Sequence, residues 1–165
     1  MFSFLVLAAL VTVQPLQYGQ TMGHSTYEHF DSTKSEKQFS ICFPFDPITS
    51  SVLNKERIKS RMCRLGSGGS AWDVIFRYYN DTLYHVISIR SSPEQYSAVV
   101  YNQQVARMER KYTEGYYTNG VYDIKDNDTG VEVSSKCKDG VCDIAVQEFL
   151  ISTVDRVNDD MADDR

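Results

Sequence analysis

The sequence at residues 127–144 is NDTGVEVSSKCKDGVCDI. It predicts a β-strand that follows an Asn-Asp turn and ends at a pair of cysteines. Four runs upstream are rich in β-branched and aromatic residues and are bounded by Gly, Pro, Asn or Asp, so each predicts a short strand. With an Asn-Gly hairpin signal in the last of them, the runs predict a small antiparallel sheet of about five strands. The runs are WDVIFRYY (72–79), TLYHVISIR (82–90), QYSAVVYNQQ (95–104) and YYTNGVYDI (116–124).

Apolar residues at helical spacing predict one helix before this sheet and one after it. The first is expected from Ile48 onward and ends at Arg64, before the flexible GSGG of residues 66–69. One amphipathic helix, a small antiparallel sheet and a C-terminal helix make an α+β fold. The C-terminal helix is expected from the spacing of Val146, Phe149, Leu150, Thr153, Val154 and Val157.

The amino terminus predicts secretion. Residues 2–13 form an uncharged apolar run that suits a signal peptide and is too short to span a bilayer, which needs about 20 residues. Cleavage is expected after Gly19, or as late as Gly23; the alternative is a buried amino-terminal strand or helix. The expected boundaries are 1–19 for the signal peptide, 20–38 for a flexible leader, 39–157 for a single disulfide-stapled domain and 158–165 for an acidic disordered tail.

The formal net charge is -5, which gives the chain no general attraction for the phosphates of nucleic acids. Two local basic clusters, at residues 54–64 and 106–112, also contain Glu, and this favours a solvated surface over a nucleic-acid site. RNA is therefore a partner only through such a local cluster, and no membrane partner is expected.

Four cysteines, Cys42, Cys63, Cys137 and Cys142, follow the predicted leader. An even number in a small secreted chain predicts two disulfides. Zinc is the rival interpretation, but the spacings match no common zinc-ligand pattern, so no metal site is expected. Four cysteines allow three pairings, and spacing alone does not choose among them.

Two sequons predict a glycoprotein. Asn80-Asp81-Thr82 and Asn127-Asp128-Thr129 are acceptor sequences for N-linked glycans, and both fall at predicted turns.

Candidate catalytic residues are sparse. His24 and His29 lie in the polar leader, so His85 is the only histidine inside the predicted sheet. It could serve as a base, but no nucleophile-elbow motif is present and the cysteines are expected to be oxidised. No glycine-rich phosphate loop runs from a strand into a helix, and no carboxylate pair is fixed by spacing on a shared face. The sequence therefore predicts a protein that is not an enzyme and holds no cofactor.

The order of elements and the fragments GVYDI, GVEVS and GVCDI, between Gly120 and Ile144, resemble the fungal guanine-specific ribonuclease fold. The chain looks more closely like the ribonuclease-like secreted effectors of powdery mildew fungi. The resemblance implies a virulence effector that is delivered into a plant host cell and binds a host protein or, in some cases, RNA. It also implies the disulfide pairings Cys42–Cys142 and Cys63–Cys137.

The resemblance further implies that the active site is lost. Ribonuclease catalysis needs a base, an acid and a cation on the phosphate. His85 matches the first strand histidine of the family, but the other roles fall on Tyr101-Asn102, Asn119 and Ser134, which supply neither a carboxylate, an arginine nor a histidine. The resemblance thus implies a pseudoenzyme on a retained scaffold.

The leading hypothesis is a secreted, non-catalytic effector that binds a host protein or RNA. One alternative is an active secreted ribonuclease that uses His85. A second is a small-ligand carrier, a β-barrel of about eight strands with a pocket lined by some of the chain's 11 Tyr, 8 Phe and single Trp72. A third, a protease inhibitor or matrix protein, has no reactive-loop signature in the sequence.

Overall fold

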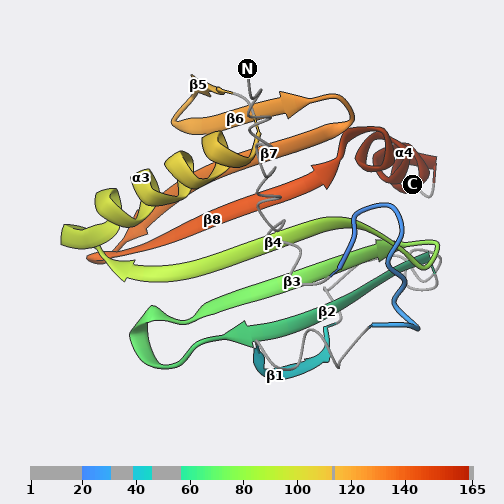
Figure 1. Ribbon diagram of the computed structural model, residues 1–165, viewed down its shortest axis with the longest axis horizontal. Coiled ribbons are helices and arrows are strands. Elements are labelled where there is room, and N and C mark those ends of the chain that lie inside the picture. Colours follow the sequence, from blue (N-terminus) through green and yellow to red (C-terminus); the bar gives the residue numbers. More distant parts are fainter. Residues whose placement is uncertain (1–19, 31–38, 46–56, 113, 164–165) are drawn as a thin grey trace, which may run out of the picture.

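The computed structural model describes residues 20–30, 39–45, 57–112 and 114–163 of the chain. In this part an eight-stranded antiparallel sheet carries two helices (Figure 1). The predicted order, a helix followed by a smaller sheet, is therefore wrong. The strands are β1 (Phe39–Pro44), β2 (Ile58–Leu65), β3 (Trp72–Tyr79), β4 (Thr82–Pro93), β5 (Tyr116–Thr118), β6 (Val121–Asp126), β7 (Thr129–Lys138) and β8 (Val141–Leu150). The helices are α3 (Glu94–Lys111) and α4 (Ile151–Asp163), with a 3-10 turn at Gly68–Ser70.

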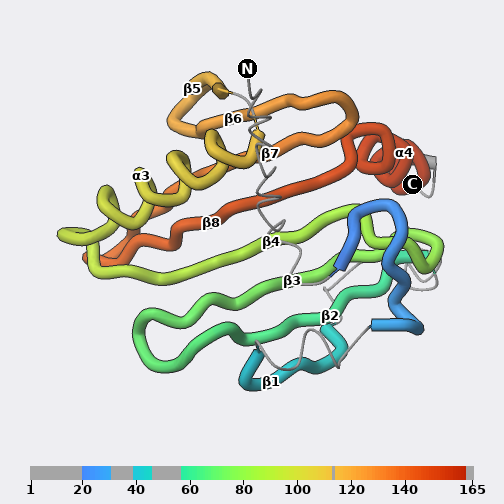
Figure 2. The backbone as a smooth tube through the Cα atoms, viewed as in Figure 1, coloured from blue at the N-terminus to red at the C-terminus, as the bar shows by residue number. Residues whose placement is uncertain are grey.

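The strand order is β1-β2-β3-β4-β8-β7-β6-β5, and neighbouring strands are antiparallel throughout. Helix α3 carries the chain from β4, in the middle of the sheet, to β5 at its edge. The chain then returns through β6, β7 and β8 until β8 pairs with β4. Strands β1 and β5 thus lie at opposite margins of an open sheet (Figure 2).

Two-residue turns join several of the neighbouring strands. Asn80-Asp81, Asn119-Gly120 and Asp139-Gly140 have positive φ at both residues, as type I′ hairpin turns require. The hairpin predicted at Asn119-Gly120 is therefore confirmed, and so is the strand at residues 72–79. Asp139-Gly140 divides residues 127–144 into β7 and β8, so the cysteine pair flanks a hairpin turn and does not end a strand.

The segment predicted as the first helix is a strand where the structure describes it. Strand β2 pairs with β3 at every position from Ile58 to Leu65, and residues 46–56 lie outside the described part. Ile58 and Met62 are four residues apart, a spacing that suits one face of a helix and equally one face of a strand. The partner strand decides between the two, because β3 faces β2 along its whole length.

The run at residues 95–104, predicted as a strand, lies in α3. Pro93 ends β4 and stands at the helix amino terminus, where a proline costs no intrahelical hydrogen bond. Val100, Val105 and Met108 are the buried residues of the helix, and the last two pack in a cluster with β6, β7 and β8. A helix that covers these strands buries more apolar surface than an added edge strand would, so tertiary packing overrides the β-propensity of the valines.

The C-terminal helix is present, but it begins later and ends later than predicted. Residues 141–150 belong to β8, and α4 runs from Ile151 to Asp163. Residues 158–163 are therefore helical and are not the disordered tail that was expected. The carboxylate of Asp128 accepts hydrogen bonds from the backbone nitrogen (2.8 Å) and the hydroxyl (2.6 Å) of Ser152, so the β6–β7 turn caps the helix start.

The expected flexible leader is packed against the sheet over residues 20–30. Tyr27 and Phe30 contact the buried rings of Tyr78 and Phe76 edge-on. The guanidinium carbon of Arg61 lies 4.7 Å from the ring centroid of Tyr27 and 4.6 Å from that of Phe30, which fixes both rings over β2. Residues 31–38 and the predicted signal peptide, residues 1–19, lie outside the described part.

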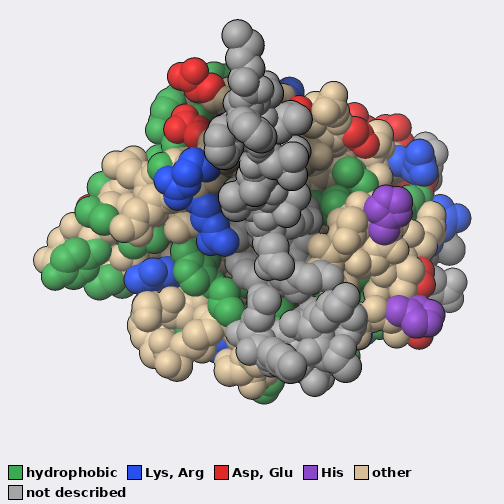
Figure 3. Space-filling model, in the orientation of Figure 1, with side chains coloured by type: hydrophobic (Ala, Val, Ile, Leu, Met, Phe, Trp, Pro, Cys, Tyr) green, Lys and Arg blue, Asp and Glu red, His purple; other side chains and the backbone are tan. Residues whose placement is uncertain are grey.

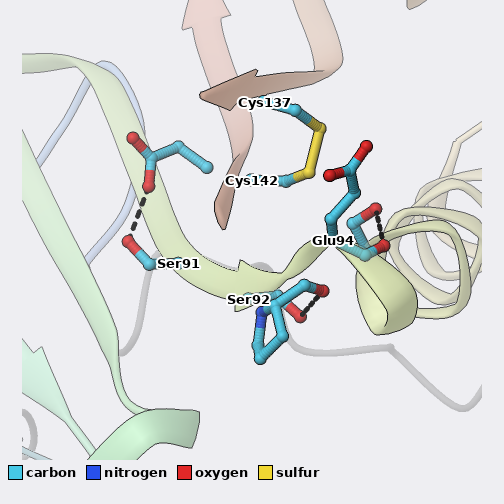
Figure 4. Close-up of a disulfide and its surroundings, with 8 residues drawn as sticks. Ser91, Ser92, Glu94, Cys137 and Cys142 are labelled. Carbon is cyan, nitrogen blue, oxygen red and sulfur yellow. Dashed lines mark hydrogen bonds between the residues drawn. A yellow bond between two sulfur atoms is a disulfide. The ribbon is translucent and has the colours of Figure 1, made fainter. Parts of the chain in front are cut away.

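Both disulfides join directly paired residues of neighbouring strands. Cys42 of β1 pairs with Cys63 of β2, and Cys137 of β7 with Cys142 of β8. The implied pairings Cys42–Cys142 and Cys63–Cys137 are therefore wrong, because β1 and β2 are separated from β7 and β8 by β3 and β4. Figure 4 shows the second disulfide beside the amino terminus of α3, where the backbone nitrogen of Glu94 donates to the Gly140 carbonyl at 2.9 Å.

Candidate functional site

His85 is a buried residue of β4. It is 9% exposed, and its Nε2 lies 3.0 Å from Oε1 of Gln147 on β8. The Nε2 of Gln147 in turn donates to a carboxylate oxygen of Glu132 on β7 at 3.4 Å. Burial, and secondarily the Arg77 cation on β3, lower the pKa of His85 from 6.5 to about 4. A histidine of this pKa is unprotonated at neutral pH and is far from the value near 7 that suits an acid-base catalyst.

The other positions that the resemblance aligned with catalytic roles do not gather around His85. Tyr101-Asn102 lies on α3, and Asn119 lies in the β5–β6 turn. Ser134 pairs with Ala145, four positions along β8 from the partner of His85, Phe149. The structure therefore does not bring these side chains together with His85 in one acid-base site.

The most deeply buried charges form an ion pair between α3 and β8. Lys111 contacts the carboxylate of Glu148, and the hydroxyl of Tyr112 donates to the same oxygen. Glu148 is 1% exposed, and burial is the largest influence on Lys111, lowering its pKa. The pair joins the end of α3 to β8. The sequence gives no periodic or spacing signal for it.

A surface groove lies between α3 and the β5–β6 hairpin, with a volume of about 320 Å³. This volume is at the lower end of the range typical of small-molecule sites, about 300–1,000 Å³. Positions i, i+1, i+4 and i+5 of α3 line one wall, since they share one side of a helix. We call this site the tyrosine groove. It is lined from α3 by Ser97, Ala98, Tyr101 and Asn102, and from the sheet by Tyr117, Gly120 and Ser135.

The two tyrosine rings of the groove differ in exposure. Tyr101 is half-buried and its hydroxyl donates to the Val133 carbonyl at 3.3 Å, which fixes the ring against β7. Burial, and then the neighbouring Tyr117, raise the pKa of Tyr101. The Tyr117 side chain is 62% exposed, so most of it is available to a ligand.

A buried tyrosine supports Tyr117 from below. The rings of Tyr117 and Tyr122 meet at a tilt with centroids 4.9 Å apart. The Tyr122 hydroxyl accepts a hydrogen bond from the Gly115 nitrogen at 2.7 Å and donates to Glu109 on α3. Burial, and then the bond to Glu109, raise the pKa of Tyr122 to about 12. Gly115 has no room for a side chain, because a Cβ there would lie 2.3 Å from the Asp123 carbonyl oxygen. The hairpin is thereby held against the helix.

The chemistry of the groove suits an uncharged ligand. Its lining offers two aromatic rings, the Asn102 amide and two serine hydroxyls, and none of its residues is charged. Further large hydrophobic side chains are exposed on α3 nearby in sequence, with Tyr96 57% and Val99 58% exposed. In Figure 3 hydrophobic side chains reach the surface over the left part of the molecule, where α3 lies in Figure 1. The sequence predicted abundant aromatics but did not indicate which of them face solvent together.

No family model, curated protein or solved structure matches this chain. Within the described ranges, no three His, Cys, Asp or Glu side chains gather as they would to hold a metal ion. Of the helices in that same part, none combines the length and the apolar character needed to cross a membrane. The helix-first order that carried the ribonuclease resemblance is not seen in the residues that the structure describes.

Proposed function

We propose that the protein is a secreted, non-catalytic binding protein and that the tyrosine groove is its binding site. The observation that carries the proposal is the pairing of a fixed ring, Tyr101, with a largely exposed ring, Tyr117, across an uncharged floor. Tyrosine is enriched in protein interfaces because it offers a large apolar area and a polar end while losing few rotamers. Secretion is supported by the apolar run at residues 2–13 and by the two disulfides.

The groove favours a protein partner over RNA. Nucleic-acid sites need Lys or Arg to neutralise phosphates, whereas no charged residue lines the groove and the chain has a net charge of -5. A protein segment with proline in an extended conformation fits this lining, because aromatic grooves accept proline rings and the segment's free carbonyls accept hydrogen bonds. The Asn102 amide can supply such a donor. The host-cell partner of an effector enters this proposal only through the family resemblance.

The open sheet does not favour the small-ligand carrier. A barrel carrier would enclose its ligand, but β1 and β5 are at opposite ends of the strand order and do not close the sheet. The groove lies on the surface between a helix and a hairpin.

A peptide titration tests the proposal. The purified full chain is titrated calorimetrically with a panel of proline-rich peptides, their Pro→Ala counterparts and a single-stranded RNA oligonucleotide. We expect a proline-rich peptide to bind, and Tyr117→Ala to weaken it about tenfold or more, which corresponds to about 1.4 kcal/mol. Tyr116→Ala is the matched control, because Tyr116 is equally an exposed residue of β5 but pairs with Asp123 on the opposite face.

Two outcomes contradict the proposal. One is peptide binding that Tyr117→Ala and Tyr116→Ala affect equally, or no peptide binding at all. The other is cleavage of the RNA that is lost in His85→Ala, which would make the protein a ribonuclease.

A further inference from the structure

The two sequons occupy equivalent places in the fold. Asn80 begins the β3–β4 turn and Asn127 begins the β6–β7 turn. Both asparagines are exposed, with φ of 47° and 53°, so each lies at a hairpin tip. An exposed side chain at a hairpin tip gives a glycan solvent into which it can extend. The fold thus accommodates a modification at both positions.

Both turns also lie at the same end of the sheet. The β6–β7 turn caps the start of α4, since the Ile151 nitrogen donates to the Asp128 carbonyl at 2.8 Å. The β3–β4 turn lies against the middle of α4, where Asn80, Thr153 and Arg156 line one cavity. Figure 1 shows both turns beside α4 on the right, and the amino-terminal end of α3 on the left.

The tyrosine groove lies toward the other end. Its residue on β7, Ser135, is six positions from Thr129, the last residue of the Asn127 sequon. At about 3.4 Å per residue along a strand, this separation is about 20 Å.

We propose that Asn80 and Asn127 both carry N-linked glycans, and that the two glycans cover the α4 end of the sheet and leave the tyrosine groove open. This inference rests on the proposed secretion but not on the ligand of the groove. In the reaction, the Nδ2 of each asparagine forms a bond to C1 of an oligosaccharide whose donor is a lipid-linked pyrophosphate. The bond between C1 and the pyrophosphate oxygen breaks, the lipid pyrophosphate leaves, and the amide loses one proton.

Glycan occupancy is tested in a eukaryotic secretion host with the full chain. Enzymatic removal of N-glycans should shift the wild type by two glycans, Asn80→Gln and Asn127→Gln by one each, and the double variant by none. Asn119→Gln is the matched control: Asn119 is also an exposed turn asparagine with positive φ, but Gly120-Val121 follows it and completes no sequon. It should keep both glycans. Fewer than two glycans on a chain that enters the secretory pathway, or a shift that persists in the double variant, overturns the inference.

A parallel expression separates this inference from the proposed secretion. The same chain with its residues 1–19 replaced by a proven signal peptide enters the pathway by another route. Two glycans on this chain but none on the native chain support the sites and refute secretion by the native leader. No glycans on either chain refute the sites.

The coverage itself is read by hydroxyl-radical footprinting of glycosylated and deglycosylated protein. Met161 of α4 is 37% exposed and should be protected by the glycans, while Tyr117 should be labelled equally in both forms. Protection of Tyr117, or equal labelling of Met161, contradicts the assigned arrangement.

Discussion

Acid should destabilise the protein through His85. The folded state holds the pKa of His85 at about 4, against 6.5 in an unstructured chain. Between these values the unfolded state binds more protons than the folded state, so stability falls as pH falls through this window. With these two pKa values, lowering the pH from 7.5 to 4.5 costs about 2.5 kcal/mol of unfolding free energy through this side chain alone. The contribution levels off about one pH unit above 6.5, where the histidine is unprotonated in both states.

The groups around His85 determine how the test is designed. Arg77 adds to the shift, whereas the bond to Gln147 opposes it. Glu132, which contacts Gln147, has the opposite linkage: burial and then Asp123 raise its pKa, so its folded form binds protons more readily in the acid range. A wild-type measurement alone would combine the two effects. The difference between wild type and His85→Gln isolates the histidine, and the glutamine amide replaces the donor to Gln147.

The assay is urea unfolding of both proteins at pH 7.5 and 4.5. The acid-induced loss of stability should be smaller in His85→Gln by about 2.5 kcal/mol. An equal loss in the two proteins would refute the buried, neutral histidine. So would an imidazole proton of His85 that titrates near pH 6.5 by NMR in the folded protein, since that value would also reopen its role as a base.

Three further predictions concern the buried ion pair and the disulfides. Lys111→Met leaves the Glu148 carboxylate, which is 1% exposed, without its cation. We expect the free energy of unfolding in urea to fall by about 3–5 kcal/mol, and to be largely recovered in Lys111→Met/Glu148→Leu. Wild-type stability of the Lys111→Met variant would contradict a paired buried charge. Non-reducing peptide mapping should recover Cys42–Cys63 and Cys137–Cys142, and a fragment that links Cys42 to Cys142 would contradict the sheet order. Replacing both cysteines of one bridge by serine should lower the free energy of unfolding. From the lengths of the closed loops, the loss is about 3 kcal/mol for Cys42–Cys63 and about 2 kcal/mol for Cys137–Cys142.

Local sequence signals predicted the hairpins better than the helices. Asn-Asp and Asn-Gly dipeptides carry their turn geometry in two residues, and the predicted turns are present at Asn80-Asp81 and Asn119-Gly120. The same reasoning applied to Asp139-Gly140 would have revealed β7 and β8 as separate strands. The helix predicted over β2 and the strand predicted within α3 failed for one reason. Spacings of four residues and short valine runs suit both structures, and the contacts that choose between them come from distant parts of the chain.

The tyrosine groove could not be predicted from the sequence for a similar reason. Tyr101 and Tyr117 belong to a chain with 11 tyrosines, and only the packing of α3 against the β5–β6 hairpin distinguishes them. His85, which the sequence did single out, is buried among β3, β4 and β8, and this burial lowers its pKa to about 4. The disulfide pairing follows from which residues of neighbouring strands lie opposite each other. The spacing of cysteines along the sequence does not indicate that register.

NMR mapping of the peptide site tests the central claim most directly. Backbone amide shifts of the isotope-labelled protein are followed as a proline-rich peptide is added. The account predicts that the perturbed amides cluster at residues 97–102, 117–120 and 135, and that the cluster disappears in Tyr117→Ala but not in Tyr116→Ala. Perturbations centred on His85 and Gln147, or spread without a cluster, would contradict a binding site in the tyrosine groove.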